Sequence, residues 1–217
     1  MVSRASNFWW KYFFSSPFSA IRDTMRQFYA GMNKAAGAIN VFNGVLSDSE
    51  LQELQDWADS VECNFGRESR NWEEGLTVDF EDVKISELYC AEQGTLPPQL
   101  EPLYRHIREY TNMPDNVSVG FMVYRWQRMS GIGTHSDGHC PRAFTFHLCK
   151  EWKQNWGGEF IFFESESDKS AGRGGVVEPR PNRLVINNSH ILHRVAYTST
   201  TAPERVTIQG FEYTKQA

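Results

Sequence analysis

The sequence predicts an α+β, mainly β domain in which N-terminal helices pack against an antiparallel sandwich or barrel. Three observations predict this class. Helical periodicity is confined to the first half of the chain, period-two alternation of apolar and polar residues dominates the second half, and glycine, proline, asparagine and serine separate the alternating segments. Short strands after a helical region are typical of helices layered on an antiparallel sheet. We expect a single domain over residues 1–217, with a helical and loop support region at 1–115 and a strand-rich core at 116–217.

The support region contains the predicted helices. Apolar residues recur at helical spacing in three segments, residues 18–36, 48–60 and 97–111. The second segment follows Ser47, and Glu50 stands three positions later, which is the pattern of a capping box. The third segment opens with two prolines, which suit the first turn of a helix. Residues 39–46 predict a short strand and turn, and the polar residues 63–80 predict a loop.

The core region contains the predicted strands. Alternation predicts strands at residues 117–125, 143–149, 158–163, 183–187 and 205–213. In the last strand Arg205 and Thr207 share one face, whereas Val206 and Ile208 share the other. Such a polar face is either solvated or lines a wet cavity inside a barrel. The serine- and glycine-rich residues 164–175 predict a mobile surface loop.

Composition narrows the class of protein. The 217 residues are 40% apolar and 23% charged, which is typical of a globular protein, and the net charge of −5 argues against a nucleic-acid partner. No stretch approaches the roughly 20 apolar residues that span a bilayer. The aromatic residues 8–18 are expected to pack on the domain, with a membrane surface or a partner as the alternative contact. The four cysteines form no C-x-x-C pair, which argues against a zinc ribbon or thioredoxin motif and indicates reduced thiols in a cytoplasmic protein.

A His-x-Asp motif is the first chemical signal. His135 and Asp137 lie two positions apart, so on an extended strand both side chains point the same way and can bind one ion. A third ligand must come from elsewhere in the chain, and His193 is the best candidate. Two histidines and one carboxylate form one face of an octahedron and leave three positions open, which suits non-haem Fe(II).

Three other histidines compete for this role. His139 follows Gly138 in a predicted turn, so we expect it to face solvent or substrate. His190 precedes His193 by three positions and would share its face only on a helix, whereas the local pattern favours a strand. His106 lies in a predicted amphipathic helix and is expected to be structural.

Further motifs stand around the His-x-Asp pair in a characteristic order. They are a strand with Tyr124, then Phe146–Trp152 (FHLCKEW), Trp156–Phe160 (WGGEF), His193–Val195 (HRV) and Arg205–Thr207 (RVT), the arginine twelve residues after the distal histidine. With these motifs the chain resembles the Fe(II)/2-oxoglutarate-dependent dioxygenases, and within them the prolyl-4-hydroxylase-like group. The resemblance implies a double-stranded β-helix (jelly-roll, cupin-like) core at 116–217 that carries the metal site.

The resemblance also implies where 2-oxoglutarate binds. In the superfamily this cosubstrate chelates the iron, and a buried cation holds its far carboxylate. Arg205 matches that cation, because a planar guanidinium can donate two charge-assisted hydrogen bonds. Thr207 on the same face and Tyr124 are implied as further contacts. His147 stands where related enzymes often carry a tyrosine that reaches the far carboxylate, so it either takes over that role or is a core histidine.

The implied reaction is hydroxylation of an unactivated C–H bond of a prolyl or other amino-acid-like substrate, coupled to decarboxylation of 2-oxoglutarate to succinate and CO2. It needs Fe(2+), 2-oxoglutarate and O2, and L-ascorbate is an additional expected reductant. The substrate would be a small molecule or a peptide. Residues expected either to grip it or simply to pack at the rim are Arg142, Trp152, Asn188 and Arg194.

Two other functions compete with hydroxylation. A non-catalytic jelly-roll binding or sensor protein could keep a vestigial metal site, but the intact positions for iron and 2-oxoglutarate argue against it. A zinc hydrolase could use the same three ligands, but it would leave Arg205 and Thr207 without a role.

Overall fold

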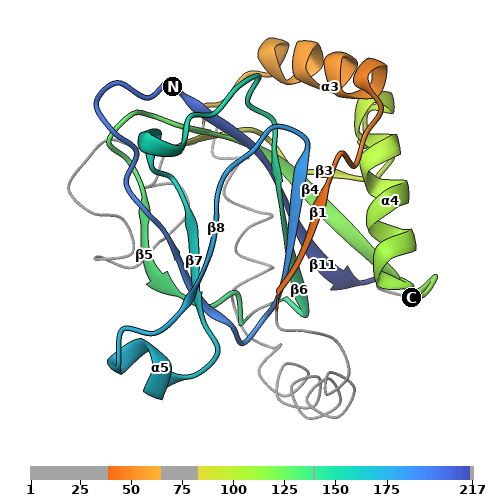
Figure 1. Cartoon of the computed structure of the whole chain (residues 1–217). Helices are drawn as coiled ribbons and strands as arrows, with labels where there is room; N and C mark the ends of the chain where they lie inside the picture. The colour runs from red at the N-terminus through yellow and green to blue at the C-terminus, as the bar shows by residue number, and fades with distance from the viewer. Residues whose placement is uncertain (1–38, 65–82, 139, 216–217) are drawn as a thin grey trace, which may run out of the picture. The chain divides into compact units, whose positions relative to one another are not determined.

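The computed structural model describes residues 39–64, 83–138 and 140–215, which belong to the compact unit formed by residues 38–217 (Figure 1). The helix predicted at 18–36 and the aromatic residues 8–18 lie outside the described residues, as does most of the loop predicted at 63–80. Within the described part of the chain, no helix is long and apolar enough to cross a bilayer.

Helices occupy few of the described residues. They are α3 (Asp48–Ser60), α4 (Glu101–Thr111), the short α5 (Glu166–Ser170) and the 3-10 turns η2 (Pro98–Leu100) and η3 (Gln154–Trp156). The predicted capping box is present at the start of α3, where the Ser47 hydroxyl accepts from the Glu50 N–H and the Glu50 carboxylate accepts from the Ser47 N–H.

Strands form the body of the unit. They are β1 (Ile39–Asn43), β2 (Val83–Ile85), β3 (Tyr89–Cys90), β4 (Val117–Trp126), β5 (Ile132–His135), β6 (Arg142–His147), β7 (Phe160–Phe163), β8 (Gly175–Val177), β9 (Arg183–Asn188), β10 (Leu192–Val195) and β11 (Arg205–Thr214). The larger sheet has the order β1-β9-β6-β11-β4-β2, with β3 also paired to β4, and the smaller sheet has the order β5-β10-β7-β8. All pairs are antiparallel. This two-sheet arrangement confirms the predicted mainly β, jelly-roll class.

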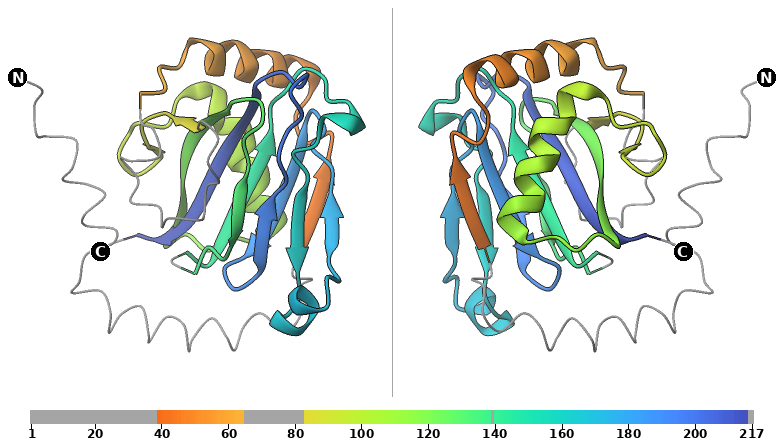
Figure 2. Two further views of the ribbon diagram at one scale, coloured as in Figure 1. Left: turned by 90° about the vertical axis from the view of Figure 1, so that its left-hand side faces the viewer. Right: turned by 90° about the vertical axis from the view of Figure 1, so that its right-hand side faces the viewer.

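The two faces of the larger sheet differ in chemistry. Its outer face is apolar and packs against α3 and α4, and Figure 2 shows α4 lying across it. Leu54 of α3, Ile107 of α4 and Phe146 of β6 are fully buried in this layer. Because side chains alternate along a strand, the neighbouring residues point to the inner face, toward the smaller sheet.

The inner face is polar as well as buried. Its members include Thr145, His147, Arg183, Asn187, Arg205 and Thr207, all at most 9% exposed. Apolar contacts join it to the smaller sheet: Tyr124 and Trp126 cluster with Ile132, and Val185 clusters with Phe160. The polar face of β11 therefore lines the interior of the sandwich and is not solvated.

Several predicted boundaries need correction. The strands β2, β3, β5 and β8 were not predicted, because segments of two to four residues are too short to show a period. At β10 only the local pattern around His193 favoured a strand. Residues 164–175, predicted as a loop, contain α5, whose start is capped by the Ser165 hydroxyl accepting from the Asp168 N–H. The helix predicted at 97–111 begins as the 3-10 turn η2 before α4 starts at Glu101.

Candidate metal centre

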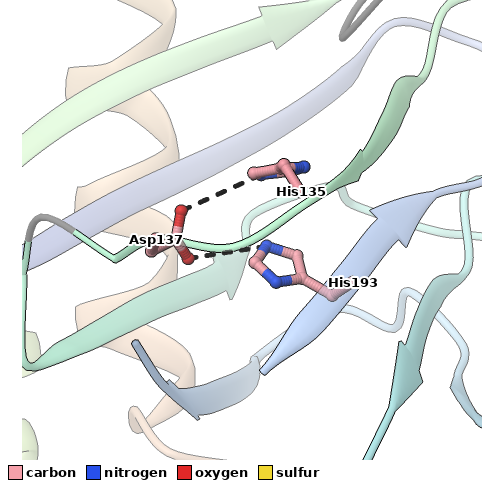
Figure 3. A group of neighbouring side chains, drawn as sticks. All are labelled: His135, Asp137 and His193. Carbon is pink, nitrogen blue, oxygen red and sulfur yellow. Dashed lines mark ion pairs between the residues drawn. The ribbon is translucent and has the colours of Figure 1, made fainter. Parts of the chain in front are cut away.

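Three predicted metal ligands meet in the structure. His135 of β5 and His193 of β10 are direct cross-strand neighbours, and Asp137 follows β5 (Figure 3). The Asp137 Oδ1 lies 3.8 Å from the His135 Nε2, and its Oδ2 lies 3.5 Å from the His193 Nε2. One ligand atom from each residue lies within 4.8 Å of the other two. Strand pairing thus joins residues that are distant in sequence.

Both imidazoles are oriented by hydrogen bonds to the backbone. The His135 Nδ1 lies 2.8 Å from the Gly133 carbonyl oxygen, and the His193 Nδ1 lies 2.9 Å from the Ile191 carbonyl oxygen. A carbonyl oxygen only accepts, so each Nδ1 carries the hydrogen and each Nε2 presents a lone pair. Backbone partners of this kind fix the tautomer of metal-binding histidines.

Other contacts hold the Asp137 carboxylate and the His193 ring. The Asn187 side-chain amide donates to the Asp137 Oδ2 over 3.0 Å. Phe160 stacks on His193 with ring centroids 4.8 Å apart. Burial, and to a smaller extent the neighbouring His135, lower the pKa of His193, although Asp137 opposes this. The imidazole of His193 is therefore neutral at neutral pH and free to act as a ligand.

This donor set fits a ferrous ion. Two neutral nitrogens and one carboxylate oxygen on one side of an ion leave the opposite side open, which is the arrangement suited to Fe(II) that binds a chelating cosubstrate and dioxygen. The three side chains are buried or partly buried at the inner side of the smaller sheet, so an ion there would be shielded from bulk water.

Arg205 is the second unusual group of the interior. It is 2% exposed, and its guanidinium carbon lies 5.0 Å from the centroid of the Trp126 ring. Among the described residues no carboxylate lies within ion-pair distance of it, and its Nε has no hydrogen-bond partner. Burial lowers the pKa of Arg205 to about 10. A buried cation without an acid is costly unless an anion binds beside it.

Hydrogen bonds leave the Thr207 hydroxyl able to donate. The Thr145 hydroxyl donates to the Gln209 Oε1 over 2.9 Å, and the Gln209 Nε2 donates to the Thr207 Oγ1 over 3.2 Å. Because Thr207 accepts in this chain, its own hydrogen is available to an acceptor in the interior. Its cross-strand neighbours are Tyr124 and His147, so all four residues predicted to bind the cosubstrate gather on the inner faces of β4, β6 and β11.

The predicted substrate residues are more scattered. The Arg142 guanidinium bonds Glu212 and the Thr111 carbonyl oxygen on the outer, helix-covered face. Asn188 also lies on that face, since its neighbour Asn187 points inward to Asp137. Arg194 is exposed and alternates with His193, so it points away from the metal ligands.

Trp152 lies nearer to the interior cluster. Its indole N–H donates to the Gly157 carbonyl oxygen over 2.9 Å. A methyl group added at Gly158 would lie 3.3 Å both from the Trp152 ring and from the Arg205 Cδ. Sequence reasoning missed Asn187 and Trp126, because only the register between strands brings Asn187 to Asp137 and Trp126 to Arg205.

The competing histidines lie elsewhere. His190 is exposed in the turn between β9 and β10. His106 is on α4, where it contacts Glu109 and stacks on Tyr110. His139 lies outside the described residues.

Solved structures with this fold include several oxygenases. A Pseudomonas putida prolyl-4-hydroxylase is 14% identical with a TM-score of 0.57, and the match covers 87% of this chain and 100% of that one. A Trichoplax adhaerens prolyl hydroxylase, solved with a hypoxia inducible factor peptide, is 15% identical with a TM-score of 0.61, covering 93% and 95%. The epimerase SnoN from nogalamycin biosynthesis is 12% identical with a TM-score of 0.58, covering 88% and 83%. At these identities the likeness shows the fold.

A family model also matches part of the sequence. Residues 120–213 match the model of the 2OG-Fe(II) oxygenase superfamily, whereas no curated protein matches the sequence. The matched family implies Fe(2+), 2-oxoglutarate and O2, and the matched segment includes His135, Asp137 and His193. Residues 120–213, which carry the jelly-roll strands and the convergent histidines and aspartate, are therefore similar to the 2OG-Fe(II) oxygenase superfamily of dioxygenase enzymes.

Proposed function

We propose that this protein is an Fe(II)- and 2-oxoglutarate-dependent hydroxylase of a prolyl or other amino-acid-like substrate. One observation carries the proposal. Two imidazole nitrogens and a carboxylate converge in the same sandwich interior that contains the buried Arg205, which has no acid partner among the described residues. A metal site beside an unneutralised cation suits a cosubstrate that chelates iron at one end and carries a carboxylate at the other.

His135, Asp137 and His193 would hold the metal. When bound, iron supplies the oxidative chemistry, in which one atom of O2 enters the substrate as hydroxyl and the other enters succinate as 2-oxoglutarate loses CO2. The protein's task is to hold the ligands and to exclude water. The Nδ1–H groups of the histidines stay bonded to backbone carbonyls, which keeps both Nε2 lone pairs directed at the ion.

Arg205 would bind the far carboxylate of 2-oxoglutarate, with the Thr207 hydroxyl as a second donor. A charge-assisted bond to a buried guanidinium is strong because little water competes for either partner. Tyr124 and His147 would line the same site. This arrangement favours a dicarboxylate over a monocarboxylate, because only the former neutralises Arg205 while it occupies the metal.

The choice of a prolyl or related substrate is supported by the names of structures that share this fold. Several structures with this fold are named prolyl hydroxylases, yet SnoN is named an epimerase, so the fold hosts more than one reaction. Of the four predicted substrate residues, we retain only Trp152. Arg142 is engaged with Glu212, and Asn188 and Arg194 point away from the inner face.

Succinate release tests the proposal. Purified protein with Fe(II) and 2-oxoglutarate is offered prolyl and lysyl peptides, free amino acids and small metabolites. Each assay is run with and without ascorbate to test the predicted role of this reductant. We expect substrate-stimulated succinate formation that disappears in His135→Ala and persists in the exposed control His190→Ala. Absence of 2-oxoglutarate binding by the metal-loaded protein would favour a non-catalytic jelly roll.

A further inference from the structure

We propose that His147 binds the cosubstrate beside Arg205 and takes up a proton when it does so, so that the affinity for 2-oxoglutarate rises as the pH falls. The inference rests on the proposed function, because it concerns the same interior site. His147 would contact the cosubstrate and would also make the affinity for 2-oxoglutarate depend on pH. Arg205 alone would not produce this pH dependence.

The position of His147 is fixed by the larger sheet. On β6 it faces Thr207 of β11 on one side and Arg183 of β9 on the other. The imidazole is 1% exposed, and among the described residues neither ring nitrogen has a hydrogen-bond partner. Buried polar groups in native proteins are normally bonded, so two orphaned nitrogens indicate that a ligand supplies the missing partner.

The surroundings of His147 indicate the charge of that ligand. β11 contributes the guanidinium of Arg205, and β9 contributes that of Arg183. Among the described residues Arg183 donates to two neutral acceptors, the Asn43 Oδ1 and the Glu178 carbonyl oxygen, each over 2.7 Å.

Two other titratable groups lie in this region of the interior. They are the phenol of Tyr124 on β4 and the thiol of Cys149 just after β6. Burial raises the pKa of the Cys149 thiol to about 11, so this group is uncharged at neutral pH. Among the described residues no carboxylate forms an ion pair with either guanidinium group, and the charge of Glu178 acts on Arg183 but not on Arg205. An anion is therefore the ligand that this cluster can stabilise.

The same charges set the protonation state without a ligand. Burial lowers the pKa of His147 well below its usual value, and Arg205 and Arg183 lower it further. The imidazole is therefore neutral at pH 7. A carboxylate that binds between His147 and Arg205 reverses the local field and favours the imidazolium, so the pKa of His147 rises on binding. Between the pKa of the free state and that of the bound state, binding takes up a proton.

The sign and size of the effect follow from linkage. If binding takes up one proton, the affinity increases by about tenfold for each unit by which the pH falls, and partial uptake gives a proportionally smaller slope. Protonation of the metal ligands acts in the opposite direction, because it weakens metal binding at low pH. A variant that lacks only the titrating group of residue 147 separates the two effects.

Calorimetry of 2-oxoglutarate binding to the Mn(II)-loaded protein provides the test. Titrations between pH 6.0 and 7.5, in buffers of different ionisation enthalpy, give the number of protons exchanged. We expect uptake in the wild type and in the exposed-histidine control His190→Gln. His147→Gln should bind with no uptake, because an amide donates a hydrogen bond but does not titrate in this range. His147→Leu should bind at least about tenfold more weakly, having lost a buried bond to a charged partner.

Two outcomes overturn the inference. One is equal proton uptake by the wild type and His147→Gln, and the other is undiminished affinity in His147→Leu. If a variant does not fold, wild-type protein with 15N-labelled histidines decides the question at pH 6.5. One imidazole should be neutral without 2-oxoglutarate and protonated with it, and no change in any imidazole refutes the proposal. If the wild type itself fails to bind 2-oxoglutarate, it is the proposed function that fails.

Discussion

The Asn187 side-chain amide donates a 3.0 Å hydrogen bond to the Oδ2 of Asp137, so one oxygen of this carboxylate is already engaged. Asn187 is 1% exposed and lies on β9, a strand of the larger sheet, whereas Asp137 follows β5 of the smaller sheet. The bond therefore links the two sheets at the candidate metal centre. It also leaves Oδ1 as the carboxylate oxygen that would hold a metal.

Replacing Asn187 by Leu should weaken metal binding. Partners that orient a metal ligand typically contribute about 10- to 100-fold in affinity, and we expect a loss in this range. Mn(II) titration followed by electron paramagnetic resonance measures it. Asn188→Ala is the matched control, because Asn188 lies on the opposite face of the same strand. Equal loss in both variants would mean that general destabilisation, and not the bond to Asp137, is responsible.

Replacing Arg205 by Met should stabilise the protein in the absence of ligand. The lowering of the Arg205 pKa to about 10 corresponds to about 3 kcal/mol of unfavourable free energy for the buried cation. We expect unfolding in urea to show a gain of about 1 to 3 kcal/mol, since an apolar side chain of similar length can occupy the same space. Addition of 2-oxoglutarate to the Mn(II)-loaded protein should further stabilise the wild type but not the variant.

Arg125 supplies the control of opposite sign. Its guanidinium bonds the Glu204 carboxylate over 2.7 Å and the Ala58 carbonyl oxygen over 2.6 Å, so Arg125→Met should destabilise the protein without removing the effect of 2-oxoglutarate. A destabilised Arg205→Met that still responds to 2-oxoglutarate would contradict the proposed anion site.

Local sequence signals predicted much of this structure. The capping box gave the start of α3, and alternation located the longer strands β4, β6, β9 and β11. The His-x-Asp motif and His193 could be identified because each belongs to a short motif, His-x-Asp or HRV, that is visible in the sequence alone. These features depend on neighbours along the chain, which a sequence records directly.

Pairing between strands could not be predicted in the same way. The choice of Asn188 over Asn187 as a site residue was a matter of one position, and only the register of β9 against β1 and β6 decides which of the two points inward. Arg142 was assigned to the site for the same reason, although Glu212 on the outer face holds it. β5 and β10 are too short for their bounds and pairing to be predicted, yet this pairing joins His135 to His193.

Removal of the α3 cap should cost measurable stability. Ser47→Ala deletes the hydroxyl that accepts from the Glu50 N–H, and we expect a loss of about 1 kcal/mol at pH 7 in urea denaturation. The backbone N–H of Ser47, and to a smaller extent its hydroxyl, lower the pKa of Glu50. Ser47→Ala removes only the hydroxyl's bond to the Glu50 carboxylate, whose contribution is present above pH 4.5 and is lost as the pH falls through the lowered pKa of the folded state. The difference between variant and wild type should therefore shrink in acid. A difference that stays constant down to the acid limit of folding would show that the bond from the Ser47 hydroxyl to the Glu50 carboxylate contributes nothing.

Substitution of Gly158 should disturb the cosubstrate site by displacing Arg205. Gly158 has a φ of 79°, and an added methyl group would lie 3.2 Å from the Thr198 Cγ2 and 3.3 Å from the Arg205 Cδ. We expect Gly158→Ala to lose about 1 to 3 kcal/mol of stability and to raise the Kd for 2-oxoglutarate, because Arg205 must shift to make room. Gly172→Ala is the control, since this glycine has a φ of 66° with no atom within 4 Å of the added methyl. It carries the same backbone strain without the crowding, so its Kd should equal that of the wild type. Unchanged binding by Gly158→Ala would mean that the position of Arg205 does not govern recognition of 2-oxoglutarate.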